Sequence, residues 1–236
     1  MREAGRITAR ALRLVGEALR PGVRTRELDS IAEATIRDEG AVPAFLGYHG
    51  FPASICSSVN EQVVHGIPGN VKLREGDIIS IDIGAIIDGY YGDSARTFPI
   101  GTASDEAMRL MDATERSLEA GISQCVSGKR LYDISHAVQV VAEGAGFSVV
   151  REYVGHGIGR AMHEEPQIPN YGPAGKGPEL REGMVFAIEP MINAGGAAVQ
   201  SLPDGWTVVT ADGSLSAHFE HTVVVTAEGP VVLTKE

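Results

Sequence analysis

The sequence predicts an α+β fold built from two halves that an approximate two-fold axis relates. The segment Leu73–Asp93, LREGDIISIDIGAIIDGYYGD, is echoed by LREGMVFAIEP from Leu180 onward at a constant offset of 107. A pair of helical patterns precedes each copy, and each copy contains an apolar, strand-like run that is expected to end in one carboxylate. Solenoid repeats have periods of about 20–50 residues, so this longer period indicates a single duplication.

Helical patterns open the first half. Apolar residues at helical spacing predict one amphipathic helix over residues 3–20, which Pro21-Gly22 ends. We expect Thr25 to cap a second helix that ends at Gly40.

The second half repeats this arrangement. Ser104 is predicted to cap a helix that buries Met108, Met111, Leu118 and Ile122, and another helix follows Gly128 and ends near Gly146. Gly22 aligns with Gly128 and Gly40 with Gly146, both at an offset of 106. We therefore expect one domain over residues 1–236, with halves of about 1–101 and 102–236, helices on one face and a curved, mostly antiparallel sheet.

An acidic hairpin lies between the two pairs of helices. Asp88-Gly89 is typical of a two-residue hairpin turn, so Ile87 would pair with Tyr90 and Gly84 with Asp93. Asp82 and Asp93 would then be diagonal neighbours on one face, about 7–8 Å apart. Two carboxylates so close repel each other, and a divalent cation would remove that cost. A solvent-exposed acidic hairpin is the plainer alternative.

Composition excludes several functions. The net charge of −11 disfavours stable binding to nucleic acid or to anionic membranes. No apolar run approaches the roughly 18 residues of a membrane span, and the charged N-terminus lacks the apolar core of a signal peptide. Cys56 and Cys125 form no CxxC motif, which is typical of proteins in a reducing compartment.

The duplication brings together candidate metal ligands. Four carboxylates occupy matched positions in the two halves: Asp82, Asp93, Glu189 and Glu220. The candidate imidazoles are His65, His156 and His163, and both His156-Gly157 and His163-Glu164-Glu165-Pro166 lie in segments that read as loops. Carboxylates with one or two imidazoles suit Mn, Fe(II), Co or Zn, and four acids can hold two metals that activate a water between them. Each residue alone has a structural alternative, and only the matched set makes a metal site the better interpretation.

The sequence resembles the type I methionine aminopeptidases of bacteria, which have the "pita-bread" fold. The resemblance spans essentially the whole chain and lies in LGYHGFPASICSSVNEQVVHGIP (46–68), DIGAIIDGYYGDSART (82–97), GHGIGRAMHEEPQIPNY (155–171), FAIEPMINAG (186–195) and DGWTVVTADGSLSAHFEHTVVVT (204–226). It implies a cytoplasmic monomer that removes the first methionine from nascent polypeptides when the second residue is small, and that contacts ribosomes transiently. The N-terminal zinc-binding extension of some eukaryotic relatives is not present in this sequence, which indicates the minimal bacterial form.

The resemblance also implies roles for individual residues. Asp82 would chelate one of two divalent ions, Asp93 and Glu220 would bridge both, and His156 and Glu189 would complete the ligand set of the other ion. Glu189 would shuttle the proton, His163 would stabilise the tetrahedral oxyanion, and His65 would contact the peptide beyond the scissile bond. Because a fixed donor stabilises charge that develops in the transition state, the role of His163 is physically reasonable.

A pocket for the methionine side chain is also implied by the resemblance. It would be formed by Tyr48, Phe51, Cys56, Met162 and Trp206, and such a sulfur- and aromatic-rich lining suits a thioether. Phe45 and Met162 depart from the family's more usual Cys and Phe. Family members also bind a monovalent cation through main-chain oxygens, and Asn60 and Ser216 occupy the matching positions.

Two other functions remain open at this point. A dimetal exopeptidase of the same fold that cleaves Xaa-Pro bonds is one alternative, although such relatives usually carry an extra N-terminal domain. An inactive protein of this fold that binds nucleic acid or partners is the other. It would be expected to lose metal ligands, yet all five are present and the acidic chain offers no basic face.

Overall fold

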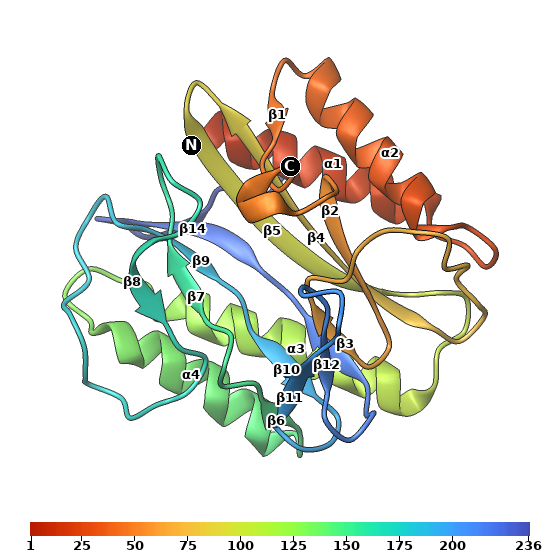
Figure 1. Ribbon diagram of the computed structural model, residues 1–236. Coiled ribbons are helices and arrows are strands. Elements are labelled where there is room, and N and C mark those ends of the chain that lie inside the picture. Colours follow the sequence, from red (N-terminus) through yellow and green to blue (C-terminus); the bar gives the residue numbers. More distant parts are fainter.

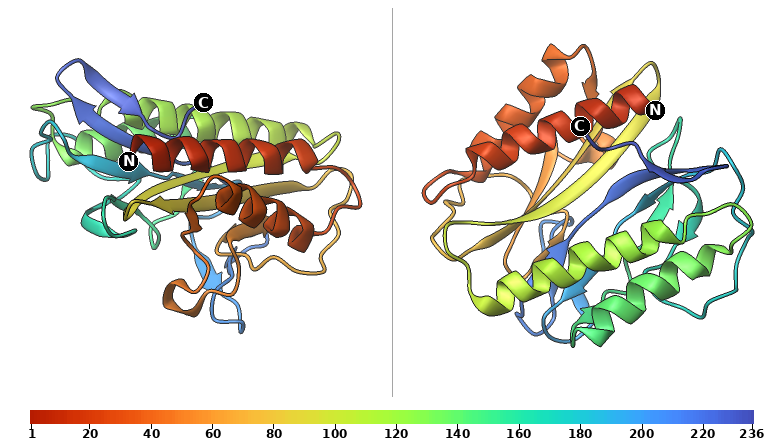
Figure 2. Two further views of the ribbon diagram at one scale, coloured as in Figure 1. Left: turned by 90° about the horizontal axis from the view of Figure 1, so that it is seen from above. Right: turned by 180° about the vertical axis from the view of Figure 1, so that it is seen from behind.

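Four helices and a set of short and long strands make up the protein, whose computed structural model describes residues 1–236. The helices are α1 (Arg2–Ala18), α2 (Thr25–Asp38), α3 (Asp105–Ser123) and α4 (Leu131–Gly144). Helices α1, α3 and α4 run across one side of the strands, and α2 packs beside α1 at the edge (Figures 1 and 2). None of the helices is long and apolar enough to cross a membrane.

The strands form four sheets, referred to here as ladders, in which every pairing is antiparallel. The first half supplies β1 (Val42–Pro43), β2 (Ile55–Val59), β3 (Gln62–Val64), β4 (Ile78–Ile87) and β5 (Tyr90–Pro99). The second half supplies β6 (Ser148–Val149), β7 (Gly155–Gly157), β8 (Glu164–Ile168), β9 (Val185–Ile188), β10 (Met191–Asn193), β11 (Val199–Ser201), β12 (Val208–Thr210), β13 (Ser216–His218), β14 (His221–Thr226) and β15 (Gly229–Val232). The ladders are β1-β4-β2 with β5 on β4, β15-β14-β9-β7-β8, β13-β10-β6, and β11-β12-β3. The last ladder joins strands from both halves, because β12 pairs with β3.

The two largest ladders meet between β5 and β14. The amide of Glu220 donates to the carbonyl of Ala95 at 2.9 Å. The Thr222 hydroxyl accepts from the amide of Asp93 at 3.0 Å and donates to its carbonyl at 2.8 Å. A side chain thus replaces part of the backbone ladder at this seam, and the expected continuous sheet is interrupted there.

Matched hydrogen bonds show how the duplication is built. In each half a glycine before the second helix donates to the leucine of the LREG segment, and that leucine donates back to the next residue. In the first half, Gly22 N donates to Leu73 O at 2.7 Å and Leu73 N donates to Val23 O at 3.0 Å. In the second half, Gly128 N donates to Leu180 O at 2.9 Å and Leu180 N donates to Lys129 O at 2.8 Å. The repeated sequence therefore folds into the same local structure twice.

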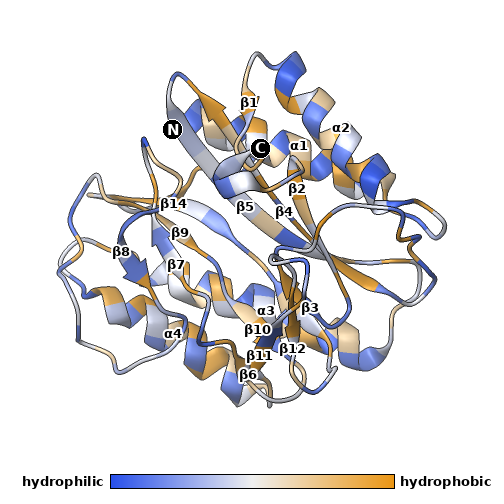
Figure 3. Cartoon of the chain, viewed as in Figure 1, coloured by the Kyte–Doolittle hydropathy of each residue, from blue (hydrophilic) through white to orange (hydrophobic).

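Each half has its own apolar core under its helices, and strand β4 shows how the two faces divide. Ile79, Ile81 and Ile83 are fully buried in the core that α1 and α2 share. The alternate residues, including Asp82 and Gly84, point to the opposite face because side chains alternate along a strand. Figure 3 shows apolar and polar residues interspersed along the helices, and apolar ones such as Ile7, Ala11 and Val15 of α1 are fully buried. The helices therefore support one face while the other is free to form a site.

Three details differ from the sequence-based expectations. Helix α2 begins at Thr25 itself, with Arg24 at the cap, because the Thr25 hydroxyl accepts from the amide of Gly69 at 2.8 Å. Met108 is 47% exposed, since Ala107 takes the inward position on α3. The others of that stripe lie inward or half-buried.

Two segments expected as loops are strands, which is the third difference. His156 lies within β7, where it pairs with Ala187 of β9, and Glu164–Pro166 lies within β8. Neither strand is visible in local sequence periodicity, because each has only three to five residues and its partners are distant in the chain.

Candidate metal centre and active site

The hairpin β4–β5 places the two aspartates of the first half on one face. Ile87 pairs with Tyr90 and Gly84 with Asp93, as the Asp-Gly turn predicts. Asp88 and Gly89 have φ of 52° and 74°, the left-handed conformation that a type I′ turn requires. Asp82 lies in the middle of β4, not at its end, because the hairpin continues for five more residues before the turn. Asp82 and Asp93 are thus diagonal neighbours facing the same cavity.

The glutamates of the second half reach the same place from breaks between strands. Glu189 directly follows β9 and precedes Pro190, which has no N–H to continue a ladder. Asn170 Nδ2 holds the backbone of Glu189 by donating to its carbonyl at 3.0 Å. Glu220 lies between β13 and β14, where its amide is bonded to β5. The two halves therefore each contribute two carboxylates.

His156 is oriented with one ring nitrogen toward these acids. Its Nδ1–H donates to the carbonyl of Gly157 at 2.9 Å. The neutral ring then presents the Nε2 lone pair, which lies 3.5 Å from Glu189 Oε1 and 3.9 Å from Asp93 Oδ2. A backbone acceptor on the far nitrogen is the usual arrangement for a metal-binding imidazole.

Burial shifts the pKa values of the acids and of the imidazole in opposite directions. Burial raises the pKa of Asp93 to about 7, and burial with neighbouring negative charge raises the pKa values of Asp82, Glu189 and Glu220 well above their usual range. Burial also lowers the pKa of His156 to about 4. Clustered acids that resist ionisation together with a neutral imidazole form a set that a divalent cation stabilises.

Unpartnered oxygens test whether the donor set fits a metal. Asp82 Oδ1, Asp93 Oδ1 and Glu220 Oε1 are buried without any hydrogen-bond partner. One ligand atom from each of Asp93, His156 and Glu220 lies within 4.8 Å of the others. Buried polar atoms normally have partners, so these oxygens and the adjacent imidazole fit a divalent cation.

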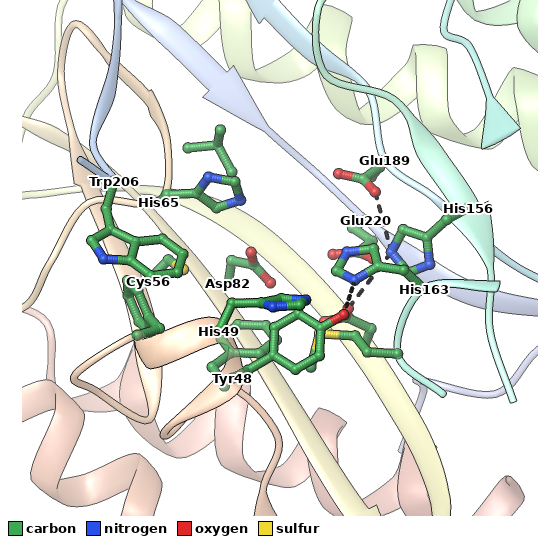
Figure 4. A pocket seen from close by; sticks show the side chains of 15 residues that line it. Tyr48, His49, Cys56, His65, Asp82, His156, His163, Glu189, Trp206 and Glu220 are labelled. Carbon is green, nitrogen blue, oxygen red and sulfur yellow. Dashed lines mark hydrogen bonds and ion pairs between the residues drawn. The ribbon is translucent and has the colours of Figure 1, made fainter. Parts of the chain in front are cut away.

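One cavity of about 240 Å³ collects the predicted site residues (Figure 4). Its lining comprises Phe45, Tyr48, His49, Phe51, Cys56, Val64, His65, Asp82, Asp93, His156, Met162, His163, Glu189, Trp206 and Glu220. Every residue that the sequence predicted for metal binding, catalysis or the methionine pocket is in this set. The structure therefore brings them all together, while their individual roles remain predictions.

The apolar end of the cavity is built from aromatic rings and sulfur. The rings of Phe51 and Trp206 meet edge to face with centroids 5.1 Å apart. Met162 and Cys56 are buried in the same cluster, and Phe45 packs there too. An apolar wall thus lies next to the carboxylates.

Two histidines flank the polar end. The hydroxyl of Tyr48 is hydrogen-bonded to His163 Nδ1 at 2.7 Å, which leaves His163 Nε2 for the cavity. The rings of His163 and His156 lie 4.3 Å apart. His65 has φ of 60°, a left-handed conformation that is uncommon outside glycine and clusters at functional sites. Its ring packs edge-on against Tyr153 with centroids 5.7 Å apart.

Sequence reasoning gave little weight to three residues that the structure places at or behind this cavity. His49 and Val64 line it, and His218 lies directly behind Glu189. His218 ends β13 and precedes Glu220 by two residues, so side-chain alternation along the strand that the sequence predicts there would place both on one side.

Asn60 and Ser216, expected near a monovalent cation, are adjacent. The amide of Ser216 donates to the carbonyl of Asn60 at 2.9 Å. The Asn60 side chain bonds to Asp77, and the Ser216 hydroxyl bonds to Asn193. The two halves thus meet at this point, and the cation itself remains a prediction.

Comparisons with known proteins agree with this geometry. The model of metallopeptidase family M24 matches residues 1–227. Methionine aminopeptidase 1 of Bacillus subtilis is 56% identical over 235 residues, which cover 100% of this chain and 95% of the relative. The crystal structure of methionine aminopeptidase from Rickettsia prowazekii has a TM-score of 0.98 at 45% identity, covering 99% of this chain and 95% of that one. The prolidase from Pyrococcus furiosus, at 22% identity and a TM-score of 0.80, covers 100% of this chain and 62% of its own, and shares the fold.

Proposed function

Because the chain belongs to metallopeptidase family M24 and, within it, to the methionine aminopeptidases, we propose that it removes the N-terminal methionine from peptides and nascent proteins whose second residue is small. The observation that carries this proposal is the single cavity in which buried carboxylates from both halves lie beside an apolar, sulfur-lined wall. The acids suit metal-assisted hydrolysis, and the wall suits a thioether.

Five side chains would hold two divalent ions. Asp82 would chelate one, Asp93 and Glu220 would bridge both, and His156 with Glu189 would complete the other. Such a pair supplies an activated water and polarises the scissile carbonyl. Mixed oxygen and nitrogen donors suit Co, Mn, Fe(II) or Zn, among which availability decides.

The protein's own groups would then position the substrate and move the proton. Glu189, which lines the cavity, would accept the proton of the attacking water and return it to the leaving amine. His163 Nε2 would donate to the oxyanion, because the Tyr48 hydroxyl occupies Nδ1 and fixes the ring. His65 would contact the peptide beyond the scissile bond.

The methionine side chain would lie against Tyr48, Phe51, Cys56, Met162 and Trp206. The edge-to-face contact of Phe51 with Trp206 supports this placement, since it fixes the end of the cavity. Phe45 adds a further ring to the same cluster. A shape-selective apolar pocket of this kind distinguishes methionine from branched residues only moderately.

We also propose the cellular setting of this activity. Residues 1–236 would act as one catalytic domain, because the cavity takes its lining from both halves. The protein would act as a monomer in the cytoplasm on emerging chains, with transient contact at the ribosome. A monovalent cation would bind near Asn60 and Ser216, where the halves meet.

Two alternatives are less well supported. An Xaa-Pro exopeptidase shares the fold, but the matching relatives at high identity are methionine aminopeptidases. An inactive binding protein would not need the unpartnered oxygens of Asp82, Asp93 and Glu220 to face one cavity.

Metal-dependent release of methionine tests the proposal. The protein should hydrolyse Met-Ala-Ser, lose this activity after treatment with a chelator, and regain it when Co(II) or Mn(II) is added back. Hydrolysis that persists after the metal has been removed to background levels would contradict a metal mechanism. Release of alanine from Ala-Pro peptides in preference to methionine would favour the exopeptidase alternative.

A further inference from the structure

The carboxylate of Glu189 lies between two imidazoles. Its Oε1 is 3.5 Å from Nε2 of His156, and its Oε2 is 3.7 Å from Nε2 of His218. One oxygen therefore faces the cluster of proposed metal ligands, and the other faces away from it. His156 already has a proposed role, whereas His218 has none.

His218 is buried and rigidly held, yet its ring has no hydrogen-bond partner. Only 1% of the residue is exposed, and both Nδ1 and Nε2 are unpartnered. Its amide donates to the Thr97 hydroxyl at 2.8 Å, and its carbonyl accepts from the same hydroxyl at 2.9 Å. It does not line the cavity, so it lies behind Glu189 and does not reach a substrate.

A buried imidazole without a hydrogen-bond partner lowers the stability of the fold, unless it donates a hydrogen bond to a neighbouring group. An unsatisfied buried donor costs about 1–3 kcal/mol, and an apolar residue would fill this position without that cost. The acceptor nearest to His218 Nε2 among its charged neighbours is Glu189 Oε2. A hydrogen bond needs a separation of about 2.7–3.2 Å, so the 3.7 Å between these two atoms would have to close by only a small rotation of the carboxylate.

We propose that His218 is a positioning residue: its Nε2–H donates to Glu189 Oε2 and so directs Glu189 Oε1 toward the metal ligands. The inference rests on the proposed role of Glu189 in the metal centre. Neutral imidazole has one N–H to donate, and a carboxylate held through one oxygen presents the other at a fixed angle. Partners of this kind set the orientation and affinity of a ligand without touching the metal.

Substitution of His218 by glutamine, asparagine and leucine tests the proposal. Glutamine carries an N–H group at about the reach of Nε2, asparagine carries the same group on a shorter stem, and leucine carries none. We expect His218→Leu and His218→Asn to bind Co(II) about 10–100-fold more weakly than the wild type, the range for loss of a ligand's orienting partner. His218→Gln should stay within about threefold of the wild-type affinity, on the same scale.

The readouts separate positioning from folding and from the proposed function. The Co(II) affinity and visible absorption spectrum report on the metal site, kcat and KM for Met-Ala-Ser report on catalysis, and melting of the chelated protein reports on the fold. His136→Leu, at an exposed histidine on α4, serves as the control and should match the wild type. The comparison of glutamine with asparagine remains decisive if the leucine variant does not fold.

The outcomes are distinct. Wild-type affinity and spectrum in both His218→Leu and His218→Asn would overturn the inference, and so would a glutamine variant as weak as asparagine. If the wild type itself neither binds Co(II) nor releases methionine, the proposed function fails instead, whatever His218 does.

Discussion

Asp93 lies 3.9 Å from His156 Nε2 and on the same face of the hairpin as Asp82, which suits its proposed role between two ions. Asp93→Asn should abolish methionine release, since an amide carries no charge to offset a second cation and ligates it poorly. The measurement is turnover of Met-Ala-Ser together with metal content per chain. Asp88→Asn in the exposed turn of the same hairpin is the control, because asparagine tolerates its positive φ. Near-normal turnover with two metals in the Asp93 variant would refute the bridging role.

His163 has a separate role at the residue scale. Removing it as His163→Ala should lower kcat by about 10²–10³, the effect of losing one oxyanion donor. Metal content should remain at the wild-type level, because the ring is held by Tyr48 and not by the acids. Loss of metal from this variant would make His163 a ligand and would contradict the assignment.

The sequence predicted the residues around the cavity well but missed those behind it. Asp82, Asp93, Glu189 and Glu220 were recognisable because the duplication puts them at matched positions. His218 was not recognisable, because the role of a buried histidine depends on which carboxylate lies next to it in the folded protein, and the sequence does not show that. His49 lines the cavity itself, through a turn in which its φ is 48°, a conformation too uncommon for a non-glycine residue to be expected from the sequence.

Elements with strong local signals were predictable, and short ones were not. The β4–β5 register followed from the Asp-Gly turn and the alternation of isoleucines. Strands β7 and β8 have no such signals, because their existence depends on pairing with β9 and with each other. The repeat also did not predict where Asp82 lies within its strand. Pro190 ends the second copy just after Glu189, whereas the first copy continues past Asp82 into a hairpin.

The N-terminus of α3 offers a test at the scale of the element. Ser104 Oγ accepts from the amide of Ala107 at 3.2 Å, so Ser104→Ala should lower the free energy of unfolding by about 1 kcal/mol. Ser104→Asp should keep most of the stability, because aspartate also caps helices and its charge suits the helix dipole. Chemical denaturation measures both, and kcat for either folded variant should be unchanged. Equal destabilisation by alanine and aspartate would show that the cap bond is not the cause.

For the whole molecule, the duplication was the most reliable prediction, and the structure repeats its hydrogen bonds at the predicted offset. The seam between the halves was not predictable. It depends on hydroxyls such as those of Thr222 and Thr97, whose partners lie more than a hundred residues away. Ser and Thr at such positions read equally well as ordinary strand residues.

The proposed substrate pocket takes its lining from both halves, since Phe51 and His65 come from one and Met162, His163 and Trp206 from the other. The second residue of the peptide must fit close to the carboxylates. A large side chain there would displace the scissile carbonyl, and a displacement of about 1 Å can reduce the rate by about 10²-fold.

A panel of tripeptides varied at the first two positions, with kcat/KM as the readout, is the most direct test of the account. We expect rapid release of methionine from Met-Gly, Met-Ala and Met-Ser peptides and little from Met-Lys, Met-Leu and Met-Trp. Leucine in place of methionine at position one should also weaken cleavage, but less than a bulky second residue does, since a shape change in an apolar pocket is worth about 1–3 kcal/mol. Comparable values of kcat/KM for Met-Ala-Ser and Met-Lys-Ser would contradict the account.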